Sequence, residues 1–212
     1  MRKIFDISVT ITNSIPVWPG DPSVKLERVS KIEDGANANV SQISMSVHTG
    51  THMDAPYHFL QDGYTIEAVP LEILIGPAQV VRVPDYVDVI DAQVIKAAAI
   101  VPNIERVLFK TRNSQFWPAK NSDFQTGFVG INEEGAKALV DLGIRLVGID
   151  YLSIAPYHKS RPTHEVLLGH QLAVLEGCDL SQVEAGMYVI YALPTKLGGS
   201  DGAPVRAVLI SE

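Results

Sequence analysis

Four residues that can bind a metal ion or carry a proton occur within one short segment. The segment spans residues 48–58, reads HTGTHMDAPYH, and contains His48, His52, Asp54 and His58. In a nearly extended chain these even-numbered positions project toward one side. Two imidazoles and a carboxylate suit Zn²⁺, Mn²⁺ or Fe²⁺. The alternative is a histidine-rich loop whose rings are satisfied by hydrogen bonds, but three of the six histidines beside an aspartate favour a metal site.

The other three histidines, His158, His164 and His170, are also close together in the sequence. The segment HEVLLGH does not match the HExxH zinc motif, because its histidines are six residues apart and a helix would not place both on one face. Glu176 follows an apolar run, where an unpaired carboxylate would be costly. The spacing alone leaves two interpretations of Glu176 open, a metal ligand or a solvated turn residue before Gly177.

No other segment carries a recognisable catalytic motif. The chain has no GxSxG segment of serine hydrolases, no phosphate-binding P-loop and no GxGxxG after a predicted strand. The single cysteine, Cys178, has no neighbour in the sequence that would activate it, so a structural thiol is favoured over a nucleophile.

A predicted strand leads directly into the histidine segment. Residues 40–47 read VSQISMSV, and their alternation puts Ile43, Met45 and Val47 on one face. If that face meets the core, His48 faces the opposite way, toward a cleft. The segment after this strand is expected to be a strand end that runs into a shaped loop.

The remaining elements are predicted from β-branched runs and from helix caps. Asp91 can cap a helix through Ala99, and Asn132 can cap another that Gly143 ends. Strands are predicted at 4–11, 78–83, 106–111, 144–150, 187–193 and 203–210. Because strands outnumber helices and the two alternate late in the chain, we expect a mixed α/β fold with a substantial sheet.

Composition bounds the class of protein. The chain has 212 residues, 46% hydrophobic residues and a formal net charge of −7, typical of one globular domain over residues 1–212. The acidic balance argues against nucleic acid as the main partner. No apolar run approaches the roughly 18 residues of a membrane span. With one cysteine and no evident signal peptide, a cytoplasmic location is expected.

The segment HTGTHMDAPYH resembles the HxGTHxDxPxH signature of the cyclase-like metal-dependent hydrolases, a family that includes bacterial kynurenine formamidase (arylformamidase) and isatin hydrolase. Three further segments agree in order: PVWPGD at 16–21, His164 with Glu176 twelve residues later before Gly177, and DGAPVRAVL at 201–209. The resemblance therefore extends over nearly the whole chain. It implies a swivelling β/β/α fold and a homodimer or larger homo-oligomer.

The resemblance also implies a set of metal ligands. His48, His52 and Asp54 would hold one ion, and Asp54, His164 and Glu176 would hold a second, with both carboxylates able to reach both ions. The expected cofactor is one or two Zn²⁺ ions, with Mn²⁺ as the alternative. For Glu176, the resemblance favours the ligand over the turn residue.

Two other residues receive roles from the same resemblance, and three do not. His58 corresponds to the family's acid/base residue, and Trp18 matches the position of an aromatic wall against the substrate ring. His158 and His170 match no metal position, so a hydrogen-bonded or outer role is expected for each. Asp201 is assigned only to building the loop near the last strand.

The leading functional prediction is hydrolysis of a small-molecule amide, N-formylkynurenine, by water that a divalent cation has made acidic. His58 would pass a proton to the leaving nitrogen. The alternatives are hydrolysis of a cyclic amide such as isatin or of another small acyl compound, a non-catalytic metal-binding module, and a ring-closing or dehydrating enzyme.

Overall fold

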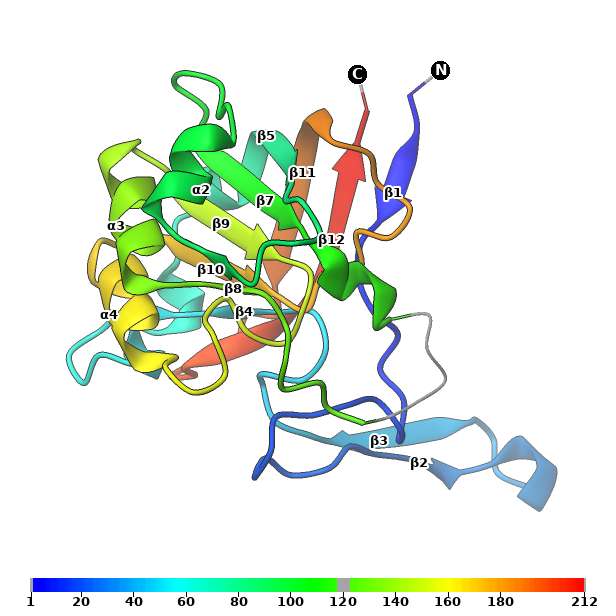
Figure 1. Cartoon of the computed structure of the whole chain (residues 1–212). Helices are drawn as coiled ribbons and strands as arrows, with labels where there is room; N and C mark the ends of the chain where they lie inside the picture. Colours follow the sequence, from blue (N-terminus) through cyan, green and yellow to red (C-terminus); the bar gives the residue numbers. More distant parts are fainter. Residues whose placement is uncertain (1, 118–122, 212) are drawn as a thin grey trace.

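A sheet that closes on itself forms the centre of the structure (Figure 1). The computed structural model describes residues 2–117 and 123–211. Around the closed sheet the strands follow in the order β12 (Gly202–Ile210), β11 (Gly186–Pro194), β5 (Ile75–Arg82), β7 (Arg106–Lys110), β9 (Leu146–Ile149), β10 (Ala173–Glu176) and β4 (His52–Asp54), which pairs again with β12. Strand β1 (Ile4–Asp6) adds to the far end of β12.

The sheet is mixed in direction. Strands β5, β7, β9 and β10 are parallel to one another, whereas β11, β12, β4 and β1 pair antiparallel with their neighbours. This confirms the predicted mixed α/β class. The strand predicted at 4–11 is observed only over Ile4–Asp6, where regular strand hydrogen bonding ends.

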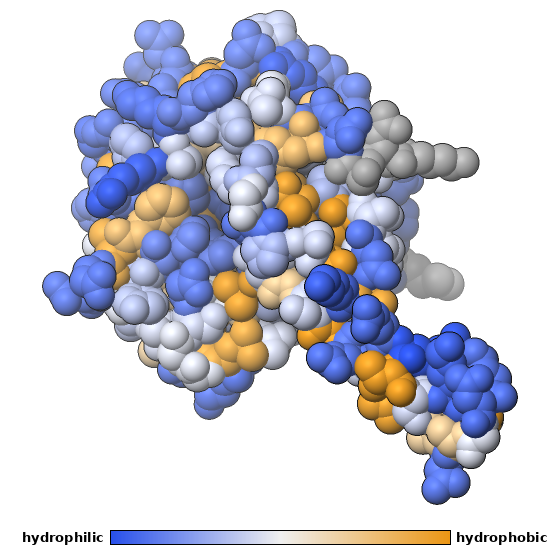
Figure 2. Space-filling view, turned by 90° about the horizontal axis from the view of Figure 1, so that it is seen from below, coloured by the Kyte–Doolittle hydropathy of each residue, from blue (hydrophilic) through white to orange (hydrophobic). Residues whose placement is uncertain are grey.

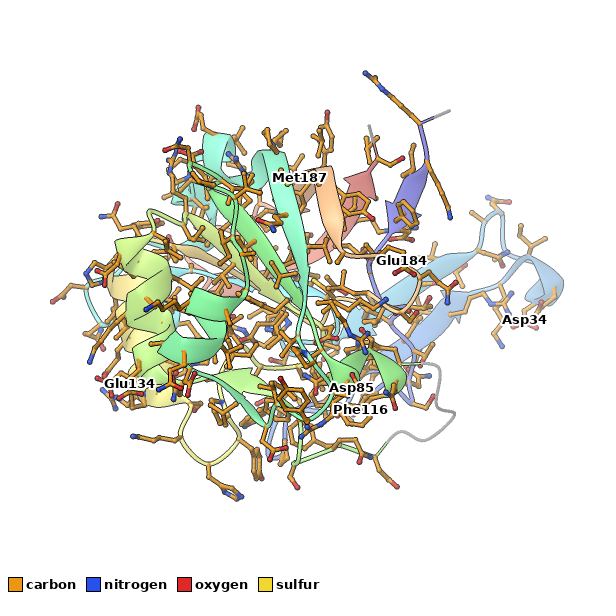
Figure 3. All side chains as sticks on the ribbon, turned by 45° about the horizontal axis from the view of Figure 1, so that its top comes forward. Asp34, Asp85, Phe116, Glu134, Glu184 and Met187 are labelled. Carbon is orange, nitrogen blue, oxygen red and sulfur yellow. The ribbon has the colours of Figure 1, made fainter. Side chains whose placement is uncertain are left out.

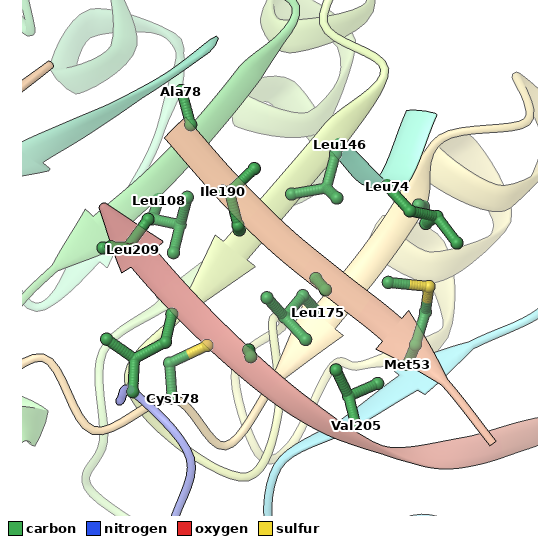
Figure 4. Close-up of a cluster of buried hydrophobic side chains, with 14 of the residues drawn as sticks. Met53, Leu74, Ala78, Leu108, Leu146, Leu175, Cys178, Ile190, Val205 and Leu209 are labelled. Atoms are coloured by element: carbon green, nitrogen blue, oxygen red, sulfur yellow. The ribbon is translucent and has the colours of Figure 1, made fainter. Parts of the chain in front are cut away.

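Side-chain alternation along the strands separates two hydrophobic cores. On β7, Leu108 points to the inside of the closed sheet, while Val107 and Phe109 point outward. On β10, Leu175 is inside and Val174 is outside. Figure 4 shows the inner core, where Leu108 and Leu175 meet side chains from β4, β5, β11 and β12. The closed sheet is therefore filled, and any pocket must form at its rim or on its outer face.

Helices cover the outer face of the parallel strands (Figure 1). They are α2 (Ala92–Ala97), α3 (Glu133–Asp141) and α4 (Arg161–Gly169), with the short α1 (Leu71–Leu74) before β5. The caps predicted from the sequence are present: the Asp91 carboxylate accepts from Gln93 N and Val94 N, and the Asn132 side chain accepts from Gly135 N. Among residues 2–117 and 123–211, none of the helices has the length and apolarity needed to cross a bilayer.

An arm projects from this body. It consists of β2 (Lys25–Ser30), the 3₁₀ turn η1 (Ile32–Asp34) and β3 (Val40–Ser44), and Figure 3 shows Asp34 at its far end. Every residue of β3 is exposed, so the expectation that Ile43 faces the core is wrong, whereas Met45 and Val47 lie past the end of the strand and are half-buried. The alternating residues belong to a two-stranded ribbon, and solvent reaches both faces of that ribbon. No other layer of the described chain covers either face.

Candidate metal centre

A pocket of about 390 Å³ opens at the rim of the closed sheet, beside β4 and β10. Its lining combines histidines and carboxylates with two aromatic side chains. The lining residues are Trp18, Asp21, Ser46, His48, His52, His58, Phe59, Leu152, Ser153, Ser160, His164, Glu176 and Asp201. Six of the seven site residues predicted from the sequence thus line one pocket, and the seventh, Asp54, lies buried next to them.

Two short neighbouring strands carry three of the carboxylate and imidazole groups. On β4, Met53 points into the inner core, so His52 and Asp54 point to the opposite, outer face. On β10, Glu176 is paired directly with His52 in the antiparallel register. The distance from His52 Nε2 to Glu176 Oε2 is 3.2 Å, and that to Asp54 Oδ1 is 3.6 Å. Strand pairing therefore brings residues 52 and 176 together.

Helix α4 adds the fourth group from above this face. His164 is buried, and its Nε2 lies 3.2 Å from Glu176 Oε1 and 3.6 Å from Asp54 Oδ2. Neither α4 nor β10 was predicted from the sequence. Glu176 is only 4% exposed, so the solvated-turn interpretation of this residue is wrong.

The arrangement leaves one carboxylate oxygen without a partner. Asp54 Oδ2 is buried and has no hydrogen bond within the described chain. An orphaned anionic oxygen among imidazoles is costly unless a cation satisfies it. Ligand atoms of His52, Asp54 and Glu176 lie within 4.8 Å of one another, as do those of His48, Asp54 and His58. The donor set therefore fits one or two divalent cations that share Asp54.

The convergence differs in one respect from the ligand sets that the resemblance implies. Asp54 is common to both groups, as expected. The structure, however, joins His52 with Glu176, whereas it joins His48 with His58. The structure shows that these side chains lie close together, and their roles as ligands stay a prediction.

Main-chain carbonyls fix the rings of two histidines. His52 Nδ1 donates to Gly50 O at 2.9 Å, and His164 Nδ1 donates to Ser160 O at 2.9 Å. Because a carbonyl oxygen can only accept, the proton of each ring is held on Nδ1. Nε2 of both rings faces Glu176, so it can donate to that carboxylate in the absence of a cation and bind a cation once its proton is lost.

His48 differs because both of its ring nitrogens face carboxylates. Its Nδ1 is 2.9 Å from Asp54 Oδ1 and its Nε2 is 2.8 Å from Asp201 Oδ2. Burial disfavours the charged ring, but these two hydrogen bonds outweigh it and raise the pKa of His48 to about 10. Burial alone would raise the pKa of Asp54, yet the bond to His48 and the nearby imidazoles hold it well below its usual range.

Metal binding is expected to release protons and to strengthen as the pH rises. In the metal-free protein the pKa of His48 is about 10, so its ring keeps both protons at neutral pH. A ligand nitrogen must give up its proton, so each proton released should raise the apparent affinity about tenfold per pH unit below that pKa. Calorimetric titration in two buffers of different ionisation enthalpy counts the protons. An affinity that does not change with pH would contradict the expectation.

His58 follows β4 in the 3₁₀ turn η2 (Pro56–His58). Its ring stacks on that of His48, with centroids 3.9 Å apart, and its Nδ1 is 3.2 Å from Asp201 Oδ2. Burial lowers the pKa of His58, an effect that the negative charge of Asp54 partly opposes. A largely uncharged imidazole at the pocket wall can take up and release a proton near neutral pH.

Aromatic side chains form part of the pocket wall. Trp18 packs edge-on against Phe124 at a centroid distance of 5.1 Å, and its ring is tilted against that of Tyr157 at 5.2 Å. Phe59 stacks nearly parallel on the His164 ring, with centroids 4.2 Å apart. Trp18 thus faces the pocket from a cluster of aromatic residues, and Phe59 braces one of the predicted ligands.

Several pocket residues were not predicted from the sequence. Phe59 directly follows His58, and Asp21 lies within the PVWPGD segment that suggested Trp18. Asp201 was assigned only to loop structure, but its side chain contacts two histidines of the site. Its position in the DGAPVRAVL segment was the available signal.

The remaining flagged residues lie outside the pocket. His158 is exposed, and His170 is exposed with its Nδ1 donating to Val166 O at 2.8 Å. Cys178 is buried and unpaired, and burial raises the pKa of its thiol well above the usual value. The hydrogen bond of His170 and the burial of Cys178 agree with structural roles, whereas the role expected for His158 stays a prediction.

Two glycines let separate segments approach at the site. A Cβ at Gly202 would lie 2.7 Å from His48 Cε1, and one at Gly177 would lie 2.0 Å from Gly50 O. Gly177 also has a φ of +70°, which favours glycine. Larger residues at either position would push apart the segments that hold His48 and His52.

Comparisons with known proteins found relatives that match nearly the whole chain. A family model described as "Putative cyclase" matches residues 5–156. Cyclase-like protein 3 of Arabidopsis thaliana is 41% identical over 217 residues, which cover 99% of this chain and 80% of that protein.

Solved structures of similar fold include one described as a potential metal-dependent hydrolase with cyclase activity. It is 34% identical, with a TM-score of 0.86, and the match covers 100% of this chain and 99% of that chain. Isatin hydrolase A from Labrenzia aggregata, bound to benzyl benzoate, has a TM-score of 0.84 at 23% identity and covers 99% and 93%. The second likeness concerns the fold alone.

Proposed function

This chain belongs to the cyclase family, and from that premise we propose that it is a metal-dependent amide hydrolase that converts N-formylkynurenine to kynurenine and formate. The observation that carries the proposal is the buried, unpartnered Asp54 Oδ2 among His48, His52, His164 and Glu176, at the base of a pocket open to small molecules.

The predicted ligands would hold the cofactor, for which we propose Zn²⁺, with Mn²⁺ as the alternative. His48, His52 and Asp54 would bind one ion, and Asp54, His164 and Glu176 a second. Such a cation, when bound, polarises a carbonyl oxygen and makes water more acidic at neutral pH. Imidazole and carboxylate ligands suit both metals.

The protein's own groups would complete the reaction. His58 presents Nε2 on the pocket side, because Nδ1 is directed to Asp201, and can deliver a proton to the nitrogen of the breaking amide bond. Trp18 and Phe59 offer aromatic faces that would orient an aryl ring. Hydrolysis adds one water across the amide and yields an arylamine and formate. An arylamine is a better leaving group than an alkylamine, which suits a site with few catalytic side chains.

The test is metal content measured alongside activity. Purified protein, its chelator-treated form and the form reloaded with zinc or manganese would be assayed on N-formylkynurenine, isatin and simple aryl formamides. We expect stoichiometric metal and turnover of N-formylkynurenine that is lost and regained with the metal. Active protein without stoichiometric metal would refute the proposal, as would metal-loaded protein inert toward the whole panel.

Cyclic amides are the second candidate substrate class. The fold is shared with isatin hydrolases, and the aromatic wall at Trp18 suits a fused ring equally well. Isatin turnover that exceeds formamide turnover would favour this candidate. Mass analysis of the products separates hydrolysis from ring closure, because the former adds a water and the latter removes one.

We also propose that the chain forms a homodimer or larger homo-oligomer through the arm of residues 25–44. Five large apolar side chains on it are well exposed: Leu26 at 41%, Ile43 at 47%, Val40 at 50%, Val29 at 56% and Ile32 at 58%. Figure 2 shows hydrophobic atoms on this arm, outside the body. A two-stranded ribbon alone is marginally stable in water, so a covering partner would stabilise it.

A second copy suits the charge of the arm. Its cations and anions are equal in number, and they are Lys25, Arg28 and Lys31 with Glu27, Glu33 and Asp34. A surface that carries both signs can complement itself across a two-fold axis. Met187, Tyr191 and Leu193 on the outer face of β11 are also exposed.

The oligomer can be tested by sedimentation. The wild-type protein is expected to sediment as a dimer or larger species, and the double variant Leu26→Lys/Ile43→Lys is expected to shift toward the monomer. Leu142→Lys, which changes an exposed leucine on the body, is the matched control and should not shift. A monomeric wild-type protein at micromolar concentration would refute the assembly.

The proposed cellular location is the cytoplasm. The only cysteine is unpaired and buried, which is compatible with a reducing compartment.

A further inference from the structure

One carboxylate oxygen connects two histidines of the site. Asp201 Oδ2 is 2.8 Å from His48 Nε2 and 3.2 Å from His58 Nδ1. The two rings are stacked with an interplanar angle of 28°, so both present an edge to the same oxygen. The Asp201 side chain is 41% exposed and lies at the pocket mouth, away from the buried Asp54.

The main chain holds Asp201 in this place. Its carbonyl accepts from Ala55 N at 2.9 Å, and the carbonyl of Ser200 accepts from Ile66 N at 2.9 Å. Gly199 N donates to the Glu67 carboxylate at 2.8 Å. The loop before β12 is therefore fastened at three consecutive residues to the segment that follows β4. These main-chain hydrogen bonds fix the backbone of Asp201 and so hold its carboxylate beside the two rings.

An ionised carboxylate can only accept hydrogen bonds, so each ring nitrogen that faces Asp201 carries a proton. For His48 that nitrogen is Nε2, so the proton that metal binding would displace is the one on Nδ1, which lies 2.9 Å from Asp54 Oδ1. For His58 it is Nδ1, and Nε2 is left for the pocket. His52 and His164 are held by single main-chain carbonyls instead. A charged acceptor forms a stronger bond than a carbonyl and can serve two rings at once.

We propose that Asp201 is a positioning residue that fixes which nitrogen bears the proton in both His48 and His58, and so keeps one ring ready to bind metal and the other ready to transfer a proton. The inference rests on the proposed metal site. It does not depend on which amide is the substrate.

Nitrogen NMR of the zinc-loaded protein, with labelled histidine, reports the proton position of each ring directly. We expect His48 to be protonated on Nε2 and His58 on Nδ1. In Asp201→Ala, His58 should populate the form protonated on Nε2. The value of kcat should fall about 10–100-fold while KM stays within about twofold, as for the loss of an outer partner of a metal site. Asp62→Ala, an exposed aspartate outside the site, is the matched control.

Two results would overturn the inference: the opposite proton positions in the wild-type protein, or unchanged positions in Asp201→Ala. If Asp201→Ala does not fold, Asp201→Asn keeps the shape of the side chain and removes its charge, with the same expected direction. The spectra need no substrate. Failure of the proposed amide hydrolysis would therefore appear as an inactive wild-type protein, independently of the proton positions.

Discussion

Replacing Asp54 by alanine is expected to abolish both metal binding and hydrolysis. Asp54 belongs to both convergent groups, and its Oδ2 is the buried oxygen that lacks a partner. Loss of an outer partner of a metal site costs about 10–100-fold in affinity or activity, so loss of a shared ligand should cost more than that range. The measurement is metal per chain by elemental analysis after dialysis, together with turnover.

Asp88→Ala is a suitable control for this experiment. Asp88 is an exposed aspartate that pairs with Arg112, far along the chain from the ligand segments. It should keep full metal content and activity. An Asp54→Ala protein that retains stoichiometric metal would exclude Asp54 as the shared ligand and, with it, the two-ion arrangement.

The second large effect is expected at His58. His58→Ala should keep its metal but lose about 10²–10⁴-fold in kcat, the contribution that a positioned proton carrier makes. The reason is geometric: His58 stacks on His48 and reaches the pocket, yet three buried side chains, those of His52, His164 and Glu176, converge with Asp54 without it. Single-turnover assays on zinc-loaded protein would measure the loss.

His170→Ala is the matched control, since this exposed histidine bonds only to Val166 O of its own helix. Its activity should equal that of the wild-type protein. Full activity in His58→Ala would remove His58 from the mechanism, whereas loss of metal in that variant would make His58 a ligand. Comparison of the Asp54→Ala and His58→Ala variants thus distinguishes an effect on ion binding from an effect on proton transfer.

Local signals account for what the sequence predicted correctly. The helices that begin after Asp91 and Asn132 were predicted because a cap is made within three residues of the chain. The predicted strands at 78–83, 106–111 and 203–210 also lie in observed strands, because a run of apolar, β-branched residues reports burial by itself.

Long-range pairing explains what the sequence did not predict. Strand β4 has three residues, too few for a periodic signal, and it exists because β10 and β12 hydrogen-bond to its two edges. The ligand segments were recognised by their residue types. The position of His52 opposite Glu176, however, depends on the register between β4 and β10. Asp201 reaches His48 across 153 residues of chain, a contact that no local pattern contains.

The arm shows the opposite failure. The alternation in residues 40–47 is regular, and it predicted a half-buried strand. Periodicity reports that two faces differ, but not that anything covers the apolar one. In this chain that face is left open, which is the reason we connect it with a second copy.

The seam between β4 and β12 has a consequence for biosynthesis. Met53 pairs with Ala203, and Asp201 lies just before that pair, so the neighbourhood of His48 is complete only when residues 201–204 have arrived. His48 is synthesised long before Asp201, because the two residues are 153 positions apart in the chain. Until those residues are made, one edge of β4 has no partner strand, so the nascent chain carries a short unpaired edge beside His52.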